Sequence, residues 1–162
     1  LKAGFIFVAL LALGNAGGRI AAGMLSDKIG RKATLLIIFL FQAVLIFGLC
    51  FVTLDQRVLF YPLSILLGAN YGANLALFPS VTKDYFGLKN FGINYGLLFT
   101  AWGVSGFVFP LLAGKLFETA KKSTGTGSYN DAYLTAAAVL VLAAALTFLT
   151  RIFEKKHKAR FI

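Results

Sequence analysis

The chain has 162 residues, of which 59% are hydrophobic and only 14% are charged. Soluble globular domains carry about 25% charged residues, so this composition excludes an ordinary soluble enzyme or binding domain. The net charge is +10, but the basic residues flank apolar runs instead of gathering into one patch. We therefore expect no nucleic acid partner.

Five runs without Asp, Glu, Lys or Arg follow one another along the chain. They cover 3–18, 33–54, 58–82, 90–114 and 132–150. A transmembrane helix needs roughly 20 mostly apolar residues, and the first run reaches that length only by continuing past Arg19. We predict an all-α membrane protein forming a single partial transmembrane domain. Its five transmembrane helices are expected at about 3–26, 33–54, 58–80, 90–116 and 131–153, with a flexible outer loop over 118–131.

Basic residues are distributed unequally between the two sides that these helices define. Ten lie in the turns at 27–32 and 83–89 and in the tail from Arg151 to Arg160, whereas five lie on the other side. Because cytoplasmic loops carry the excess of Lys and Arg, we predict a multi-pass protein of a plasma or inner membrane with a cytoplasmic C-terminus. Anionic membrane lipid is expected to attract the basic tail.

Small and polar residues recur inside the predicted helices. Gly14 and Gly18 are four residues apart, as are Gly68 and Gly72, and this spacing favours close packing of helices in lipid. Asn70 and Asn74 are also four apart and share one helix face. Buried amides in a membrane need partners or water, so these two either join helices or line a polar cavity.

Arg19 lies inside the first predicted helix. A charge at the centre of a membrane helix costs roughly 2.5–3.5 kcal/mol on insertion scales, so it marks a functional candidate. Asp27, at the helix end, is about 12 Å away along the axis, which makes it difficult for Arg19 to reach the cytoplasmic interface. Substrate binding, bonding to helix amides and snorkelling remain open as its roles.

The segment GMLSDKIGRK resembles the loop signature of the major facilitator superfamily. The matching residues are Gly23, Leu25, Ser26, Asp27, Lys28, Gly30, Arg31 and Lys32. The resemblance implies a twelve-helix transporter in which this loop, formed by Gly23, Asp27, Lys28, Gly30, Arg31 and Lys32, acts as a conformational latch. A plain topology signal is the alternative. Gly23 is expected to allow two helices to approach closely, Gly30 to permit the tight turn, and Asp27 to lie at a neighbouring helix N-terminus.

Residues 79–114, with the segment DYFGLKNFGINYG, resemble the oxalate/formate antiporter family, whose layout the monocarboxylate transporters share. The chain then corresponds to helices eight to twelve, and the missing N-terminal half of the transporter is an expected partner. The resemblance implies secondary active transport of small organic anions, mono- or dicarboxylates such as formate or oxalate, by alternating access. It implies no cofactor, no metal and no enzymatic activity.

In those families an arginine of helix eight binds the substrate carboxylate, and Arg19 takes that place. The remaining candidate substrate-binding residues are Asn15, Asn70, Asn74, Tyr95 and Trp102. Proton-coupled relatives carry an Asp one turn before the arginine, where this chain has Asn15, so proton coupling is not expected there. The oxalate antiporters add a Lys in helix eleven, whereas residues 90–114 contain no cation, which favours a monocarboxylate.

Two alternatives share the same fold: a proton-coupled monocarboxylate symporter and a non-transporting membrane sensor. An integral-membrane enzyme is disfavoured, because no acid lies within the five apolar runs and the sole histidine, His157, lies in the tail.

Overall fold

The computed structural model describes residues 2–52 and 56–159, with side chains for 4–52, 56 and 58–150. Within these ranges the chain is helical and contains no strand, which confirms the all-α class. The elements are α1 (Lys2–Ile29), α2 (Arg31–Gly48), the 3-10 helix η1 (Leu49–Phe51), α3 (Arg57–Phe86), α4 (Phe91–Thr124) and α5 (Asn130–Ala159). The predicted end of the second helix at 54 and the last tail residues, 160–162, lie outside the described residues.

Four of the helical segments are long and apolar enough to cross a membrane. They are Gly4–Ile29, Arg31–Phe51, Phe91–Thr124 and Asn130–Thr150. The helix α3 is not among them, since amides at Asn70 and Asn74 lower the mean hydropathy of its central part. A fifth crossing through α3 therefore stays a prediction.

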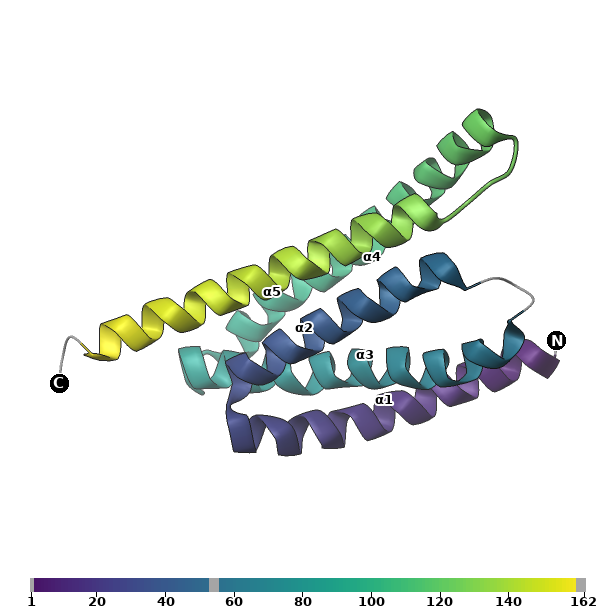
Figure 1. Ribbon diagram of the computed structural model, residues 1–162. Helices are drawn as coiled ribbons and strands as arrows, with labels where there is room; N and C mark the ends of the chain where they lie inside the picture. The colour runs from purple at the N-terminus through teal and green to yellow at the C-terminus, as the bar shows by residue number, and fades with distance from the viewer. Residues whose placement is uncertain (1, 53–55, 160–162) are drawn as a thin grey trace.

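The helices are arranged around the close pair α1 and α3, which lie side by side (Figure 1). Helix α2 packs against both, and α5 runs along α2, whereas α4 contacts α3 and α5 only lightly. The α1–α2 turn, the α3–α4 turn and the end of α5 all lie at the same end of the molecule. We call this the basic end, because it holds Lys28, Arg31, Lys32, Lys83 and Lys89.

Glycines bring the backbones of α1 and α3 into direct contact. A Cβ at Gly18 would overlap the backbone of Ala69, and one at Gly72 would overlap the backbone of Asn15. Gly14 and Gly68 make equivalent contacts one turn earlier in each helix. The predicted close packing at these four positions is confirmed, and the order of the contacts shows that α1 and α3 run parallel.

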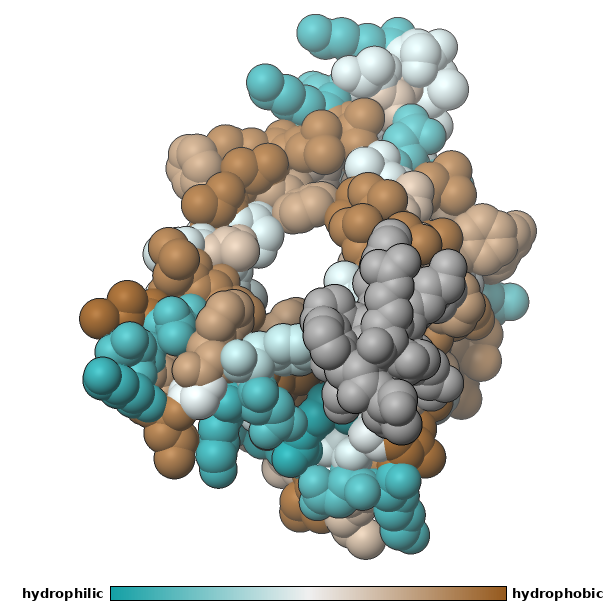
Figure 2. Space-filling model, turned by 90° about the vertical axis from the view of Figure 1, so that its left-hand side faces the viewer, coloured by the Kyte–Doolittle hydropathy of each residue, from teal (hydrophilic) through white to brown (hydrophobic). Residues whose placement is uncertain are grey.

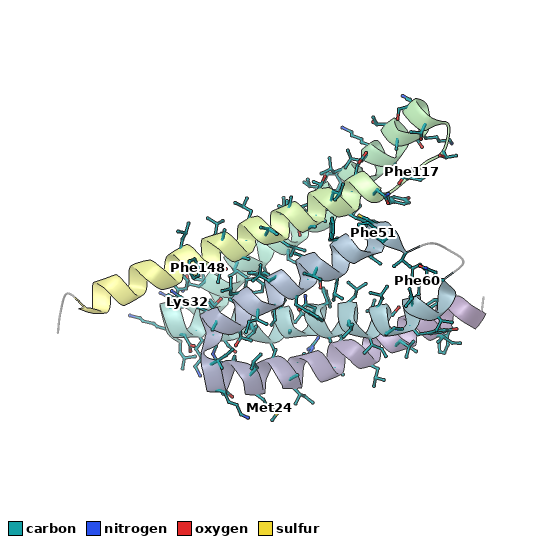
Figure 3. All side chains as sticks on the ribbon, in the orientation of Figure 1. Met24, Lys32, Phe51, Phe60, Phe117 and Phe148 are labelled. Carbon is teal, nitrogen blue, oxygen red and sulfur yellow. The ribbon has the colours of Figure 1, made fainter. Side chains whose placement is uncertain are left out.

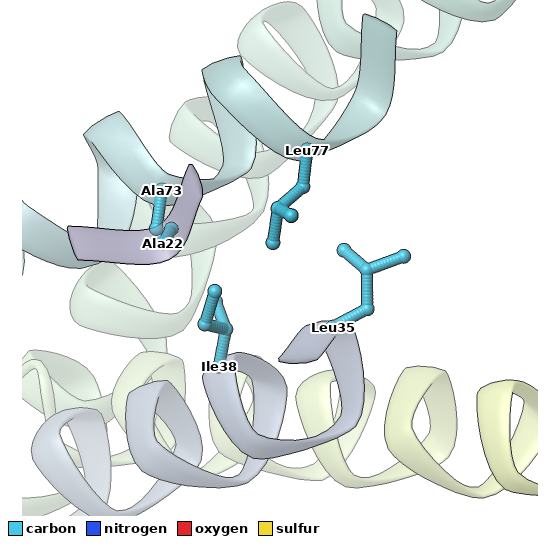
Figure 4. Packing of buried hydrophobic residues seen from close by; sticks show 5 residues of the cluster. All are labelled: Ala22, Leu35, Ile38, Ala73 and Leu77. Atoms are coloured by element: carbon cyan, nitrogen blue, oxygen red, sulfur yellow. The ribbon is translucent and has the colours of Figure 1, made fainter. Parts of the chain in front are cut away.

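The buried apolar cluster joins the first three helices near the basic end. Figure 4 shows Ala22 of α1, Leu35 and Ile38 of α2, and Ala73 and Leu77 of α3 facing one another. Leu77 is 1% exposed. This cluster and the glycine contacts hold α1, α2 and α3 together as one unit.

The fourth helix is longer than expected from the sequence, since it continues to Thr124 instead of ending near 116. The flexible loop predicted over 118–131 is therefore wrong, because helical structure covers Glu118–Thr124 and resumes at Asn130. Ala120, Lys121 and Lys122 favour helix, and Gly125 ends it with a φ of 77°.

Candidate functional site

Arg19 lies on an exposed face of α1, one turn after Asn15. Its Nε donates a hydrogen bond to Asn15 Oδ1 over 3.1 Å. The structure records no further hydrogen bond or ion pair for Arg19 within the described ranges. Asn15 thus orients the guanidinium through Nε, and the two terminal NH₂ groups are left to donate hydrogen bonds to a planar anion.

Asn70 faces away from that surface and joins two helices. It is 3% exposed, and its Nδ2 donates to the backbone oxygen of Ile38 at 3.1 Å and to Gln42 Oε1 at 2.5 Å. Both acceptors belong to α2. Of the two roles that the sequence left open, the geometry at Asn70 matches the joining of helices.

Asn74 differs from Asn70 although the two share a helix. Its Nδ2 donates to the backbone oxygen of Asn70 at 2.9 Å, while its Oδ1 is buried without a hydrogen-bond partner among the described residues. Leaving a buried acceptor unpaired costs about 1–3 kcal/mol. Asn74 lies where two pockets meet, one between α3 and α4 and one bordered by Gln42, Tyr71 and α5.

The pocket between α3 and α4, which we call the aromatic pocket, has a volume of about 420 Å³. Tyr95 and Trp102, both predicted site residues, belong to its α4 wall. They belong to a ladder of stacked or tilted rings in which Phe91 and Tyr95 are 5.6 Å apart, and Phe99 is 5.2 Å from both Tyr95 and Trp102. The helical spacing of these four rings places them along one side of α4.

The structure therefore divides the predicted binding residues into two groups. Asn74, Tyr95 and Trp102 meet at the aromatic pocket, whereas Arg19 and Asn15 form a pair on α1. The two groups lie at a similar level along the axis of α3. Asn15 Oδ1 is 2.8 Å from a Cβ built at Gly72, and Gly72 follows Tyr71 of the pocket wall. Asn70 belongs to neither group.

At the basic end, Arg31 connects three helices. Its Nη1 lies 3.3 Å from Asp27 Oδ1 and 2.6 Å from Ser26 Oγ, both of α1, and its Nε lies 3.1 Å from Asp84 Oδ2 of α3. Ser26 is 2% exposed and donates in turn to the backbone oxygen of Gly23. Arg31 thus ties the start of α2 to the ends of α1 and α3.

The other residues of the loop signature have separate positions. Gly30 adopts a φ of 89° between α1 and α2, a conformation that favours glycine. Lys32 lies 4.8 Å from the centre of the Tyr85 ring and donates to the backbone oxygen of Thr150 of α5 at 3.4 Å. Figure 3 shows Lys32 near Phe148 of the same helix. Lys28 is exposed.

Gly23 makes no close helix contact within the described part of the chain, so its expected role stays a prediction. No atom of the described chain lies within 4 Å of a Cβ built at Gly23, so no helix approaches it closely there. The close approaches lie deeper in the bundle, at the four glycines shared by α1 and α3.

Seen from the basic end, the molecule is hollow. Figure 2 shows hydrophilic side chains gathered on part of this face and an opening between the helices that hydrophobic surface largely borders. The two pockets that share Tyr71 and Asn74 account for open space inside the bundle.

Sequence reasoning missed Asp84, Gln42 and Tyr71. Asp84 and Arg31 are 53 positions apart in the sequence, and no sequence pattern predicts a contact between residues so far apart along the chain. Gln42 is a lone amide in an apolar helix, and this polarity was a signal for a buried hydrogen bond. Tyr71 precedes Gly72 in the segment already noted for its amides.

Comparison with known proteins agrees with this arrangement. A sequence profile of the Major Facilitator Superfamily matches residues 2–161. The chain is 32% identical to the uncharacterized MFS-type transporter YhjX of Escherichia coli (strain K12) over 60% of its own length and 24% of that protein. It is 29% identical to monocarboxylate transporter 12 of Homo sapiens over 88% of its length and 27% of that protein. It is 33% identical to the oxalate:formate antiporter of Oxalobacter formigenes over 59% of its length and 23% of that protein.

The chain spans about a quarter of the length of these curated relatives. The relatives are transporters, and together with the four apolar helices they indicate an integral, multi-pass membrane protein. Because the profile covers nearly the whole sequence, the chain belongs to the Major Facilitator Superfamily.

Proposed function

We propose that this chain is part of a secondary transporter that moves small organic anions across a membrane by alternating access. Arg19 is the observation that carries the proposal. It is the one basic residue between Lys2 and Lys28, and Asn15 holds its Nε at 3.1 Å. A carboxylate that meets the two terminal NH₂ groups would form a bidentate, charge-assisted pair.

The single charge favours substrates with one carboxylate. The aromatic pocket is lined by neutral side chains, and α4 carries no cation before Lys115. Two relatives are named for monocarboxylates and for oxalate and formate, and both substrate types present a carboxylate that Arg19 would bind. The neutral Asn15 favours anion uptake or exchange without a proton carried at that position.

The proposal extends to the partner and the orientation of the chain. A further part of the transporter, including the N-terminal half, completes the binding site from the other side. A fifth crossing through α3 and a cytoplasmic basic end give the arrangement that the excess of basic residues favours. Arg31, which joins α1, α2 and α3, acts in the latch at this end.

Arg19→Ala in the complete transporter that contains this segment is expected to abolish carboxylate uptake. Arg19→Lys is expected to leave weak uptake with a raised KM, because an ammonium keeps the charge but not the planar fork. Counterflow into proteoliposomes measures both variants, and their expression and thermal melting in detergent serve as controls. Undiminished uptake by the Ala variant would overturn the role of Arg19.

Binding without counterflow would instead indicate a sensor. Isothermal titration with the same carboxylates separates the two cases, since a transporter both binds and exchanges its substrate.

A further inference from the structure

The second pocket is bordered by α2, α3, α4 and α5, and we call it the four-helix pocket. Its volume is about 360 Å³. Gln42 of α2 and Tyr71 and Asn74 of α3 are its polar lining residues, and the others, among them Phe109 of α4 and Ala136 of α5, are apolar. None of the described residues that line it is charged. Because burying an unpaired ion is costly, this lining favours a neutral molecule.

The orientation of the Gln42 amide follows from its contact with Asn70. The backbone oxygen of Ile38 can only accept, so the Asn70 atom that lies 3.1 Å from it is Nδ2. The same Nδ2 lies 2.5 Å from the Gln42 side chain, whose contacting atom is therefore the acceptor, Oε1. Gln42 Nε2 is left over, and it donates no hydrogen bond within the described chain.

The orientation of the Asn74 amide is fixed in the same way. The backbone oxygen of Asn70 can only accept, so it is Asn74 Nδ2 that lies 2.9 Å from it. Asn74 Oδ1 is then the buried atom that receives no hydrogen bond from the described residues. Two residues that border the pocket thus have one spare donor, Gln42 Nε2, and one spare acceptor, Asn74 Oδ1. A hydroxyl group both donates and accepts through a single oxygen, so it matches this pair.

The size and the apolar part of the lining define the rest of the occupant. A cavity of about 150 Å³ holds a benzene molecule, and apolar cavities stay dry. A single water could pair with both amides but would leave most of the four-helix pocket unfilled. An apolar body that carries the hydroxyl would fill the space beside Phe109 and Val139.

We infer that the four-helix pocket binds a small neutral alcohol with an apolar body. Its hydroxyl donates to Asn74 Oδ1 and accepts from Gln42 Nε2, and its body packs against the apolar lining. Arg19 does not line this pocket, so the site is separate from the carboxylate site proposed at that residue. The inference does not depend on the proposed transport function.

Three probes of similar shape test the hydroxyl: benzyl alcohol, benzyl methyl ether, which accepts but cannot donate, and toluene, which does neither. A ligand that binds the folded protein raises its melting temperature with concentration, so thermal melting of the complete transporter in detergent gives a Kd for each probe. Benzyl alcohol is expected to bind about tenfold more tightly than the ether, because the ether leaves Asn74 Oδ1 unpaired. Toluene is expected to bind most weakly.

Two variants test the position of the site. Ala136→Leu adds volume to the pocket wall and is expected to weaken binding of all three probes by about tenfold or more. Its matched control is Ala138→Leu, an exposed position of the same helix outside the pocket, which is expected to leave binding unchanged. Asn74→Leu is expected to remove the advantage of the alcohol over the ether, and its own melting transition without probe shows whether it folds.

Equal binding of the three probes by the parent protein would overturn the assignment of the hydroxyl. Absence of stabilisation by benzyl alcohol, as expected if water alone fills the pocket, would overturn the inference as a whole. Equal effects of the probes on Ala136→Leu and Ala138→Leu would also overturn it, because the binding would then lie elsewhere. Counterflow of carboxylates is measured separately, so neither result decides the proposed function.

Discussion

At the scale of single residues, the neutral amide of Asn15 has a direct electrostatic effect on Arg19. An Asn at this position donates or accepts without charge, so the guanidinium keeps its full positive charge for a substrate. An Asp there would place an anion at the same 3.1 Å contact and would compete with the substrate carboxylate.

Asn15→Asp is therefore expected to make uptake depend on pH. The ionised carboxylate would occupy the guanidinium and weaken anion binding by about tenfold or more, since hydrogen bonds between charged groups contribute about 1.5–3 kcal/mol. Protonation at lower pH removes that competition, so uptake by the variant rises as pH falls. Counterflow across a pH series measures it, with the parent protein as the reference. A flat profile for the variant at the parent level would contradict this account.

At the scale of the elements, the contact between α1 and α3 explains which parts of the fold could be read from the sequence. The Gly14/Gly18 and Gly68/Gly72 spacing predicted close helix packing, because small residues are what helices in lipid need at a crossing. The sequence did not say that the two pairs face each other, since the contact depends on the tertiary arrangement. Gly92 and Gly96 of α4 have the same spacing, yet no atom of the described chain outside the helix's own backbone lies within 4 Å of a Cβ at either position.

Gly18→Ala is expected to destabilise the protein by about 1–3 kcal/mol, because its Cβ would overlap the Ala69 backbone and the helices must separate. Gly17→Ala is the matched control, since no atom of another helix within the described residues lies within 4 Å of a Cβ there. Thermal melting of the purified transporter in detergent compares the two. Equal melting temperatures would argue against the close contact.

The candidate site was predictable only in part for a similar reason. Charge and polarity identified Arg19, Asn74 and Trp102 as unusual for an apolar helix, but residue type alone could not group them. Asn70 and Asn74 share one helix, yet Asn70 is bonded to α2 and Asn74 borders the pocket. That difference depends on where α2 packs, which the spacing of the two amides does not reveal.

At the scale of the whole molecule, the basic residues and the fold agree on which ends belong together. Both basic turns and the end of α5 lie at one end in Figure 1, and the α4–α5 connection lies at the other. The positions of the charges were read directly from the sequence. Because successive helices alternate in direction, every second connection was expected on the same side. The helix lengths were less predictable. Helix α4 continues beyond its apolar run into a polar segment, and the length of the apolar run does not determine where such a helix ends.

Cysteine labelling tests the orientation. In a Cys50→Ala background, Thr126→Cys in the α4–α5 connection is expected to react with a membrane-impermeant maleimide in intact cells. Lys89→Cys, exposed in the α3–α4 turn, is expected to react only after permeabilisation. Labelling in the reverse pattern would place the basic end outside the cell.

The direct backbone contact between α1 and α3 also fixes the spacing of these two helices. At the four glycine crossings the backbones of the two helices are in direct contact, so the pair is expected to move as one rigid body. Arg19 on α1 and Asn74 on α3 would then keep a constant separation while the transporter changes shape. Under the proposed mechanism, Arg19 would meet the substrate carboxylate at the same position relative to α3 in every state, and the other half of the transporter would move around this fixed pair of helices.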